Sequence, residues 1–156
     1  MSVYAAYHRN RWNRVTHFIG VPAIVFALFI PLGWVGLGGG VTLAHVFATA
    51  VLLYYFTLDV VIALATAGAV LVLLGAASLA GAYGTNAGWT WFAVFFVGGW
   101  VLQLVGHVFE GRRPALADNV LQIFVAPVFL VAEVFFMLGF KRDLRDRIEA
   151  ADPRRA

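Results

Sequence analysis

Cysteine is absent from the 156 residues, and charged residues make up only 12% of them. Without cysteine the chain forms no disulfide, and it offers no thiolate for a structural zinc site or an iron–sulfur cluster. Histidine, carboxylate and amide oxygen are therefore the candidate metal ligands. The few charges are also unevenly placed, because the chain is uncharged from Val15 to Leu58 and again from Val60 to Phe109.

Apolar residues fill these two uncharged runs. They make up 62% of the chain, and the mean hydropathy is +0.87, well above what soluble domains carry. A transmembrane helix needs roughly 20 apolar residues, so each run can hold two of them. The sequence therefore predicts an all-α integral membrane protein. Its basic residues are explained by membrane topology, and no nucleic-acid partner is expected.

The apolar stretches divide into five segments, at residues 16–35, 41–57, 60–82, 89–109 and 120–140. Glycines, Asp59 and a glycine-rich turn separate the first four. We expect a single integral-membrane domain over residues 1–156, with a charged amphipathic tail at 141–156 that is suited to contact anionic lipid. The polar stretch before the first segment argues against a cleaved signal peptide.

The basic residues predict the topology. All eleven lysines and arginines lie before the first segment, at Arg112 and Arg113, or in the tail, and the positive-inside rule places all three groups in the cytoplasm. Four crossings satisfy this rule. The chain between Arg113 and Lys141 is shorter than the ~40 residues that two more crossings need, so the fifth segment is expected to re-enter or to lie along the interface, broken near Pro127. The predicted location is a bacterial cytoplasmic membrane, or the endoplasmic reticulum in a eukaryote, with both termini cytoplasmic.

Polar residues gather at the cytoplasmic ends of the first and fourth segments. Gln103, His107 and Glu110 are spaced to share one face of a helix, and this topology brings them to the same side of the membrane as His8 and His17. A single histidine in a membrane helix often only hydrogen-bonds a neighbouring helix. Three histidines and a carboxylate on one side of the membrane favour a functional site.

Two other polar residues lie inside apolar segments. Glu133 has no basic residue near it in the sequence, and a buried carboxylate needs a partner. We expect that partner from elsewhere in the fold, with a metal-bound or hydrogen-bonded histidine as the candidate, unless the carboxylate turns toward water. His45 lies apart from the other polar residues. A hydrogen-bonding role is favoured for it over that of a fourth metal ligand.

Two motifs extend this pattern. The first consists of Tyr7-His8-Arg9-Asn10, Asn13, His17, Gly20 and Pro22. The second consists of Gln103-Leu104-Val105-Gly106-His107-Val108-Phe109-Glu110, Arg112-Arg113-Pro114-Ala115-Leu116, Asp118-Asn119, Gln122, Ala126-Pro127 and Glu133. In this order they resemble the motifs of the iron-dependent 2-hydroxy fatty acid dioxygenases, membrane enzymes of fatty-acid α-oxidation. The resemblance covers nearly the whole chain, although residues 36–88 match only in hydrophobic character.

The resemblance implies an oxidoreductase that uses Fe(II) and dioxygen to shorten a 2-hydroxy fatty acid by one carbon. Neutral imidazoles suit Fe(II), and the implied metal ligands are His8, His17 and His107. Glu110 is implied as a further catalytic residue. The implied further ligands, or residues that support the ligands, are Glu110, Asn119, Gln122 and Glu133. The implied substrate-binding residues are Asn13, Gln103, Arg112 and Arg113.

Several alternatives stay open at this point. The two arginines are explained equally well as charges that set the topology. The whole histidine cluster also fits a proton relay in a small transporter or lipid-binding protein, or a zinc-dependent membrane lipid hydrolase. In the dioxygenase interpretation the acyl chain lies along the apolar segments, with membrane lipid as a further partner. An oligomer is compatible with the sequence but is not indicated by it.

Overall fold

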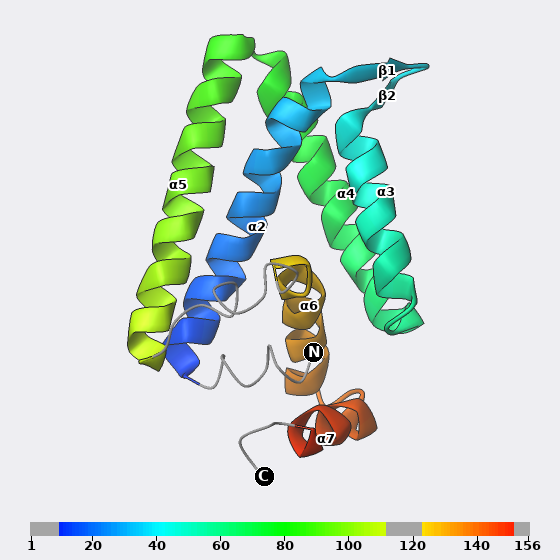
Figure 1. Ribbon diagram of the computed structural model, residues 1–156, viewed down its shortest axis with the longest axis vertical. Coiled ribbons are helices and arrows are strands. Elements are labelled where there is room, and N and C mark those ends of the chain that lie inside the picture. Colours follow the sequence, from blue (N-terminus) through cyan, green and yellow to red (C-terminus); the bar gives the residue numbers. More distant parts are fainter. Residues whose placement is uncertain (1–9, 112–122, 152–156) are drawn as a thin grey trace. The chain divides into compact units, whose positions relative to one another are not determined.

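A computed structural model describes residues 10–111 and 123–151 of the chain (Figure 1). In chain order its elements are α2 (Arg11–Trp34), β1 (Gly36–Gly38), β2 (Val41–Thr42), α3 (Leu43–Phe56), α4 (Val60–Ala82), α5 (Thr85–Glu110), α6 (Ala126–Met137) and α7 (Arg142–Ala150). The chain divides into two compact units, Met1–Phe18 with Leu102–Ala156, and Ile19–Val101. The predicted all-α membrane class is confirmed, and the single domain over residues 1–156 stays a prediction.

The unit Ile19–Val101 has its core between helices. Helices α3 and α4 contact one another along their lengths, as the hairpin in Figure 1 shows. Small side chains predominate where they pack, which lets helix backbones approach closely in a membrane protein. The buried core residues are Phe29, Ile30, Ala44, Ala48, Val70, Ala77 and Ala80.

Short polar sequences define where these helices begin. Asp59, predicted as the turn between the second and third segments, is the N-cap of α4, and its Oδ1 accepts hydrogen bonds from the backbone N–H groups of Val61 (3.0 Å) and Ile62 (3.1 Å). An acidic N-cap satisfies backbone donors that have no partner within the helix. Helix α4 consequently occupies residues 60–82, as predicted.

A glycine hairpin separates α2 from α3. Strands β1 and β2 pair antiparallel, with Gly36 opposite Thr42. Gly38, Gly39 and Gly40 all have positive φ (98°, 58° and 78°), a conformation that costs glycine little. The sequence indicated only a break here and did not predict this small two-stranded sheet, which leaves the all-α class unchanged. The fourth segment also begins earlier than predicted, at Thr85, directly after Gly84 (φ 101°).

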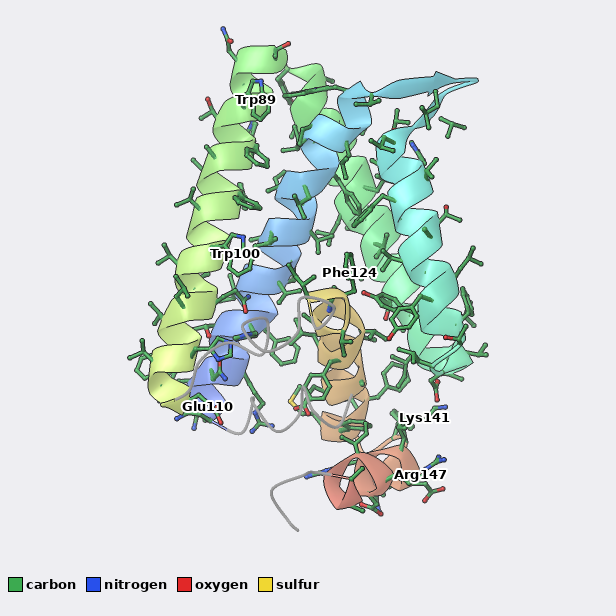
Figure 2. All side chains as sticks on the ribbon, viewed as in Figure 1. Trp89, Trp100, Glu110, Phe124, Lys141 and Arg147 are labelled. Atoms are coloured by element: carbon green, nitrogen blue, oxygen red, sulfur yellow. The ribbon has the colours of Figure 1, made fainter. Side chains whose placement is uncertain are left out.

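Helices α2 and α5 approach closely within the same unit. A Cβ atom at Gly99 would lie 2.9 Å from the carbonyl oxygen of Gly20 and 2.6 Å from Cγ1 of Ile24. Contacts this close require glycine, as is common between membrane helices. Further along, the rings of Trp34 and Trp89 meet edge to face with centroids 5.2 Å apart; Figure 2 shows Trp89 on α5.

The long helices have the length and the surface of membrane spans. Of the described residues, α2, α4 and α5 are long and apolar enough to cross a bilayer, and their 24, 23 and 26 residues exceed the roughly 20 that a crossing needs. Large apolar side chains are exposed on α4, where Val72 is 72% exposed and Leu79 69%. Hydrocarbon solvates such a surface, whereas water does not. The chain is therefore an integral membrane protein.

Two apolar segments form shorter helices. Helix α3 has 14 residues and α6 has 12, which corresponds to roughly 21 and 18 Å of rise, against a hydrocarbon core of roughly 30 Å. Pro127 lies in the first turn of α6, where a missing N–H is tolerated, so the predicted break becomes a helix start. The length of α6 agrees with a segment that does not cross; the number of spans stays a prediction.

The charged tail is partly helical. Residues Arg142–Ala150 form α7, which follows Gly139 and Lys141, both with positive φ (81° and 55°). Ile148 is buried whereas Arg142 and Arg145 are exposed, so α7 has the amphipathic character that was predicted for the tail. Figure 2 shows Lys141 and Arg147 at this end of the chain.

Candidate active site

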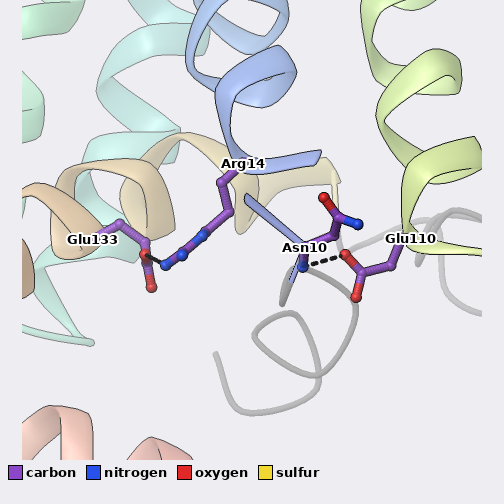
Figure 3. Close-up of polar contacts among 4 residues, drawn as sticks. All are labelled: Asn10, Arg14, Glu110 and Glu133. Carbon is purple, nitrogen blue, oxygen red and sulfur yellow. Dashed lines mark hydrogen bonds and ion pairs between the residues drawn. The ribbon is translucent and has the colours of Figure 1, made fainter. Parts of the chain in front are cut away.

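The site lies in the unit formed by Met1–Phe18 and Leu102–Ala156, where the start of α2 meets the end of α5. Oε2 of Glu110 accepts hydrogen bonds from the backbone N–H of Asn10 (2.7 Å) and from Nδ2 of Asn13 (3.1 Å), and the first of these is drawn in Figure 3. Nδ2 of Asn10 donates in turn to the carbonyl oxygen of Phe109 (2.8 Å). A carboxylate at a helix N-terminus also interacts favourably with the helix dipole. Through these hydrogen bonds, Glu110 links the last turn of α5 to the first turn of α2.

Asn10 starts the helix that carries His17. Its Oδ1 accepts a hydrogen bond from the backbone N–H of Trp12 (2.8 Å), and its carbonyl oxygen accepts one from the N–H of Arg14 (3.1 Å). These are the bonds of an asparagine N-cap. Because Glu110 holds Asn10 at the same time, the beginning of α2 has a fixed position relative to the end of α5 in this unit.

His17 is 2% exposed, and its Nδ1 lies 2.8 Å from the carbonyl oxygen of Asn13. A carbonyl oxygen can only accept a hydrogen bond, so Nδ1 must carry the proton. In the neutral imidazole the other nitrogen, Nε2, is then the one with a lone pair. A backbone carbonyl that fixes the tautomer in this way is a regular accompaniment of metal-ligating histidine. The geometry of His17 thus fits a ligand that binds through Nε2.

His107 is the second imidazole of the site. Its ring lies edge to face with that of His17, with centroids 5.1 Å apart and an interplanar angle of 88°. It is 6% exposed, and its Nδ1 is buried. The structure therefore brings together two of the three predicted metal ligands, although they lie ninety positions apart in the sequence.

Gly106 allows this approach. A Cβ atom there would lie 2.5 Å from Oδ1 of Asn13, closer still to Oγ1 of Thr16, and 3.2 Å from Nδ1 of His17. A side chain at residue 106 would displace these three side chains or the helix that carries them. In the sequence, Gly106 is noticeable only as part of the second motif. A glycine directly before a histidine in an apolar helix is a signal for close helix packing that could have identified it.

Two predicted substrate-binding residues are buried beside the histidines. Asn13 is 0% exposed, and its side-chain amide nitrogen donates to Glu110. Gln103 is 7% exposed and lies one helical turn before His107. Their roles in substrate binding stay predictions.

The partner of Glu133 differs from the one expected. Nη1 of Arg14 lies 3.1 Å from Oε2 of Glu133 (Figure 3), so the ion pair joins α2 to α6. The expected partner was a histidine, and Arg14 was interpreted as a topological charge. Glu133 is 15% exposed and Arg14 41%, so the arginine stays partly exposed while its guanidinium satisfies a largely buried carboxylate.

His45 makes the hydrogen-bonding contacts that were favoured for it. Its Nδ1 accepts from the backbone N–H of Thr42 (3.2 Å) and lies 2.9 Å from the hydroxyl oxygen of Thr42. Thr42 is the N-cap of α3, so the histidine contributes to a helix cap.

The remaining predicted site residues are outside the described part of the chain: His8, Arg112, Arg113, Asn119 and Gln122. Within residues 10–111 and 123–151, no three His, Cys, Asp or Glu residues form a group that could hold a metal ion. The described part of the site supplies two imidazoles, and in one of them the hydrogen bond to a backbone carbonyl leaves Nε2 as the nitrogen with a lone pair. Neutral nitrogen donors fit Fe(II), and a set of few protein ligands leaves coordination positions open for substrate.

The fold and the site define a multi-helix membrane protein with paired imidazoles buried where two helix ends meet. The chain matches the family described as "2-hydroxy-palmitic acid dioxygenase Mpo1-like" over residues 1–138. It is 35% identical, over 151 residues, to the 2-hydroxy-palmitic acid dioxygenase MPO1 of Saccharomyces cerevisiae, and the alignment covers 96% of this chain and 85% of the yeast protein. No solved structure matches it. The chain belongs to the Mpo1-like 2-hydroxy-palmitic acid dioxygenase family, which confirms the family that its motifs predicted.

Proposed function

We propose that this protein is an Fe(II)-dependent dioxygenase that converts a 2-hydroxy fatty acid to the fatty acid one carbon shorter. The observation that carries the proposal is the pair of buried imidazoles, with the Nδ1 proton of His17 engaged by the carbonyl oxygen of Asn13. The family and the name of the yeast relative support a dioxygenase that acts on 2-hydroxy-palmitic acid. They favour an oxidoreductase over the transporter and hydrolase alternatives.

The proposed reaction balances with dioxygen as the only oxidant. The 2-hydroxy acid and dioxygen give the shortened acid, carbon dioxide and water. The bond between C1 and C2 breaks, C1 leaves as carbon dioxide, and C2 becomes the new carboxyl carbon. The two carbons together supply the four electrons that reduce dioxygen, so no 2-oxo acid is needed as a second reductant.

Each residue of the site has a defined task in this proposal. His17, through Nε2, would hold iron together with His107 and His8, and the bound iron would supply the activation of dioxygen and the polarisation of the substrate. Asn13 keeps His17 in the ligating tautomer. Glu110 holds Asn10 and Asn13, and in this arrangement it supports the ligands by positioning α2. The buried position of both rings excludes bulk water from the reacting atoms.

The membrane gives the substrate access to the site. A long acyl chain partitions into hydrocarbon, and the exposed apolar faces of the helices offer it a surface to follow. The proposed topology places the site and both termini on the cytoplasmic side of a bacterial membrane, or of the endoplasmic reticulum in a eukaryote. A cysteine introduced near residue 156 would then resist a membrane-impermeant label in intact cells, and its rapid labelling would contradict this topology.

Oxygen consumption tests the activity. Purified protein supplied anaerobically with Fe(II) is expected to consume oxygen when 2-hydroxypalmitate is added and to release pentadecanoic acid, which mass spectrometry identifies. Palmitate, which lacks the hydroxyl group, is the matched control and is expected to give neither result. If 2-hydroxypalmitate caused no oxygen uptake with iron present, the proposed activity would be wrong.

A further inference from the structure

Gln103 carries a buried donor whose role is not explained by the fold. The residue lies on α5 four positions before His107, so the two side chains share one helix face. Gln103 is 7% exposed, and among the residues that the structure describes its Nε2 atom is buried without a hydrogen-bond partner. Buried amide groups almost always have a partner. Such a donor one turn from a buried imidazole points to an acceptor that comes from outside the chain.

Two carboxylates of the same unit, on the helices α5 and α6, are already engaged by other groups. Glu110 accepts from Asn10 and Asn13, and Glu133 is paired with Arg14. The acceptor for Gln103 is therefore expected from a ligand. An amide nitrogen only donates, whereas an ionised carboxylate only accepts and has room for several donors. A carboxylate is thus the group that best complements Nε2.

We propose that Nε2 of Gln103 donates a hydrogen bond to the carboxylate of the 2-hydroxy acid and so sets how the polar end of the substrate lies beside the histidines. This inference rests on the proposed function and adds a specificity-determining contact to it. Hydrogen bonds to a charged acceptor are about twice as strong as neutral ones. Placing a neutral amide in an apolar membrane helix also costs less free energy than placing an arginine or lysine there.

The test compares two ligands and two forms of the protein. The ligands are 2-hydroxypalmitate and 1,2-hexadecanediol, which keeps the hydroxyl group and lacks the carboxylate. Gln103→Met preserves the length of the side chain and removes the donor. Binding is measured anaerobically on iron-loaded protein at one fixed detergent concentration, where turnover cannot occur. The dissociation constant for 2-hydroxypalmitate is expected to rise about tenfold to hundredfold in Gln103→Met, as expected for a lost hydrogen bond to a charged group, and that for the diol to stay unchanged.

Stability and metal content separate a ligand contact from a structural role. Because the donor has no partner in the free protein, its removal is expected to leave the thermal midpoint unchanged or raise it, with iron content unaltered. Gln103→Glu, which replaces the donor by a negative charge, is expected to weaken 2-hydroxypalmitate binding at least as much. It provides the measurement if the methionine variant does not fold.

Three results would overturn the inference. One is unchanged affinity for 2-hydroxypalmitate in folded Gln103→Met. Another is an equal loss of affinity for acid and diol together with a lower thermal midpoint, which would indicate a structural role. The third is loss of iron, which would place Gln103 in the metal site. If the wild-type protein neither binds nor oxidises 2-hydroxypalmitate, the proposed function itself fails and this inference falls with it, a result distinct from the other three.

Discussion

Replacement of Gly106 by alanine tests whether the close approach of α2 and α5 is what positions His17. The added methyl group would lie 2.5 Å from Oδ1 of Asn13, nearer to Oγ1 of Thr16, and 3.2 Å from Nδ1 of His17. Neither the asparagine nor the histidine can move without disturbing the bonds of Asn13 to Glu110 and to the imidazole. Either these side chains leave their positions or the two helices separate at this point, and in both cases the position of His17 beside His107 is disturbed.

The magnitude follows from two opposing effects. Overpacking of a tight contact destabilises by about 1–3 kcal/mol, while alanine gains up to about 1 kcal/mol over glycine in a helix. With both effects in full, the net loss is about 0–2 kcal/mol, which lowers the thermal midpoint by up to about 8 °C for a domain of this size. Turnover is more sensitive, because a displacement of about 1 Å in a catalytic site can reduce the rate about a hundredfold.

The assay combines thermal unfolding in detergent, followed by circular dichroism, with turnover of 2-hydroxypalmitate. Gly98→Ala is the matched control, since a Cβ atom at Gly98 meets nothing within 4 Å; it is expected to keep full turnover and to unfold at the same or a higher temperature. Gly99→Ala, which crowds Gly20 and Ile24, is expected to lose stability with a smaller loss of turnover. Wild-type stability and turnover in Gly106→Ala would refute the reasoning.

Three further variants test separate contacts. Glu110→Ala removes the acceptor of two hydrogen bonds and is expected to destabilise by about 1–3 kcal/mol; loss of iron at an unchanged thermal midpoint would instead identify a metal ligand. A double-mutant cycle with Arg14→Gln and Glu133→Gln is expected to give a coupling of about 0.2–1 kcal/mol, as for a partly exposed ion pair, and zero coupling would contradict the pairing. His45→Ala removes part of a helix cap and is expected to cost about 0.5–2 kcal/mol in stability while turnover is kept; abolished turnover in the folded variant would contradict that structural role.

Much of the fold is predictable because the lipid environment restricts it. Uncharged runs longer than one crossing indicate where the long helices lie. Asp59 is the single charged residue between two such runs, and this indicates the turn there. The hairpin at Gly36–Thr42 was not predictable in the same way. Its strands are two or three residues long, and glycine runs indicate a turn without specifying its pairing.

The sequence indicated that His17 and His107 belong to one site. It did not indicate the contacts that surround them, such as the ion pair of Glu133. Helical spacing and the positive-inside rule predict that His17 and His107 lie on one side of the membrane. Contact between the two helices depends on packing that spacing does not encode. The pairing of Glu133 was mispredicted for this reason. In the sequence, Arg14 is one of several basic residues that the positive-inside rule explains. Only the position of α6 in the fold brings the carboxylate of Glu133 to it.

Metal content is the most direct test of the central claim. Protein purified anaerobically and reconstituted with Fe(II) is expected to retain about one iron per chain after desalting, because nitrogen ligands hold it. His17→Ala and His107→Ala are each expected to lose the iron, and His45→Ala to keep it. Retention of iron by folded His17→Ala and His107→Ala, or zinc in place of iron in active protein, would contradict the proposed site.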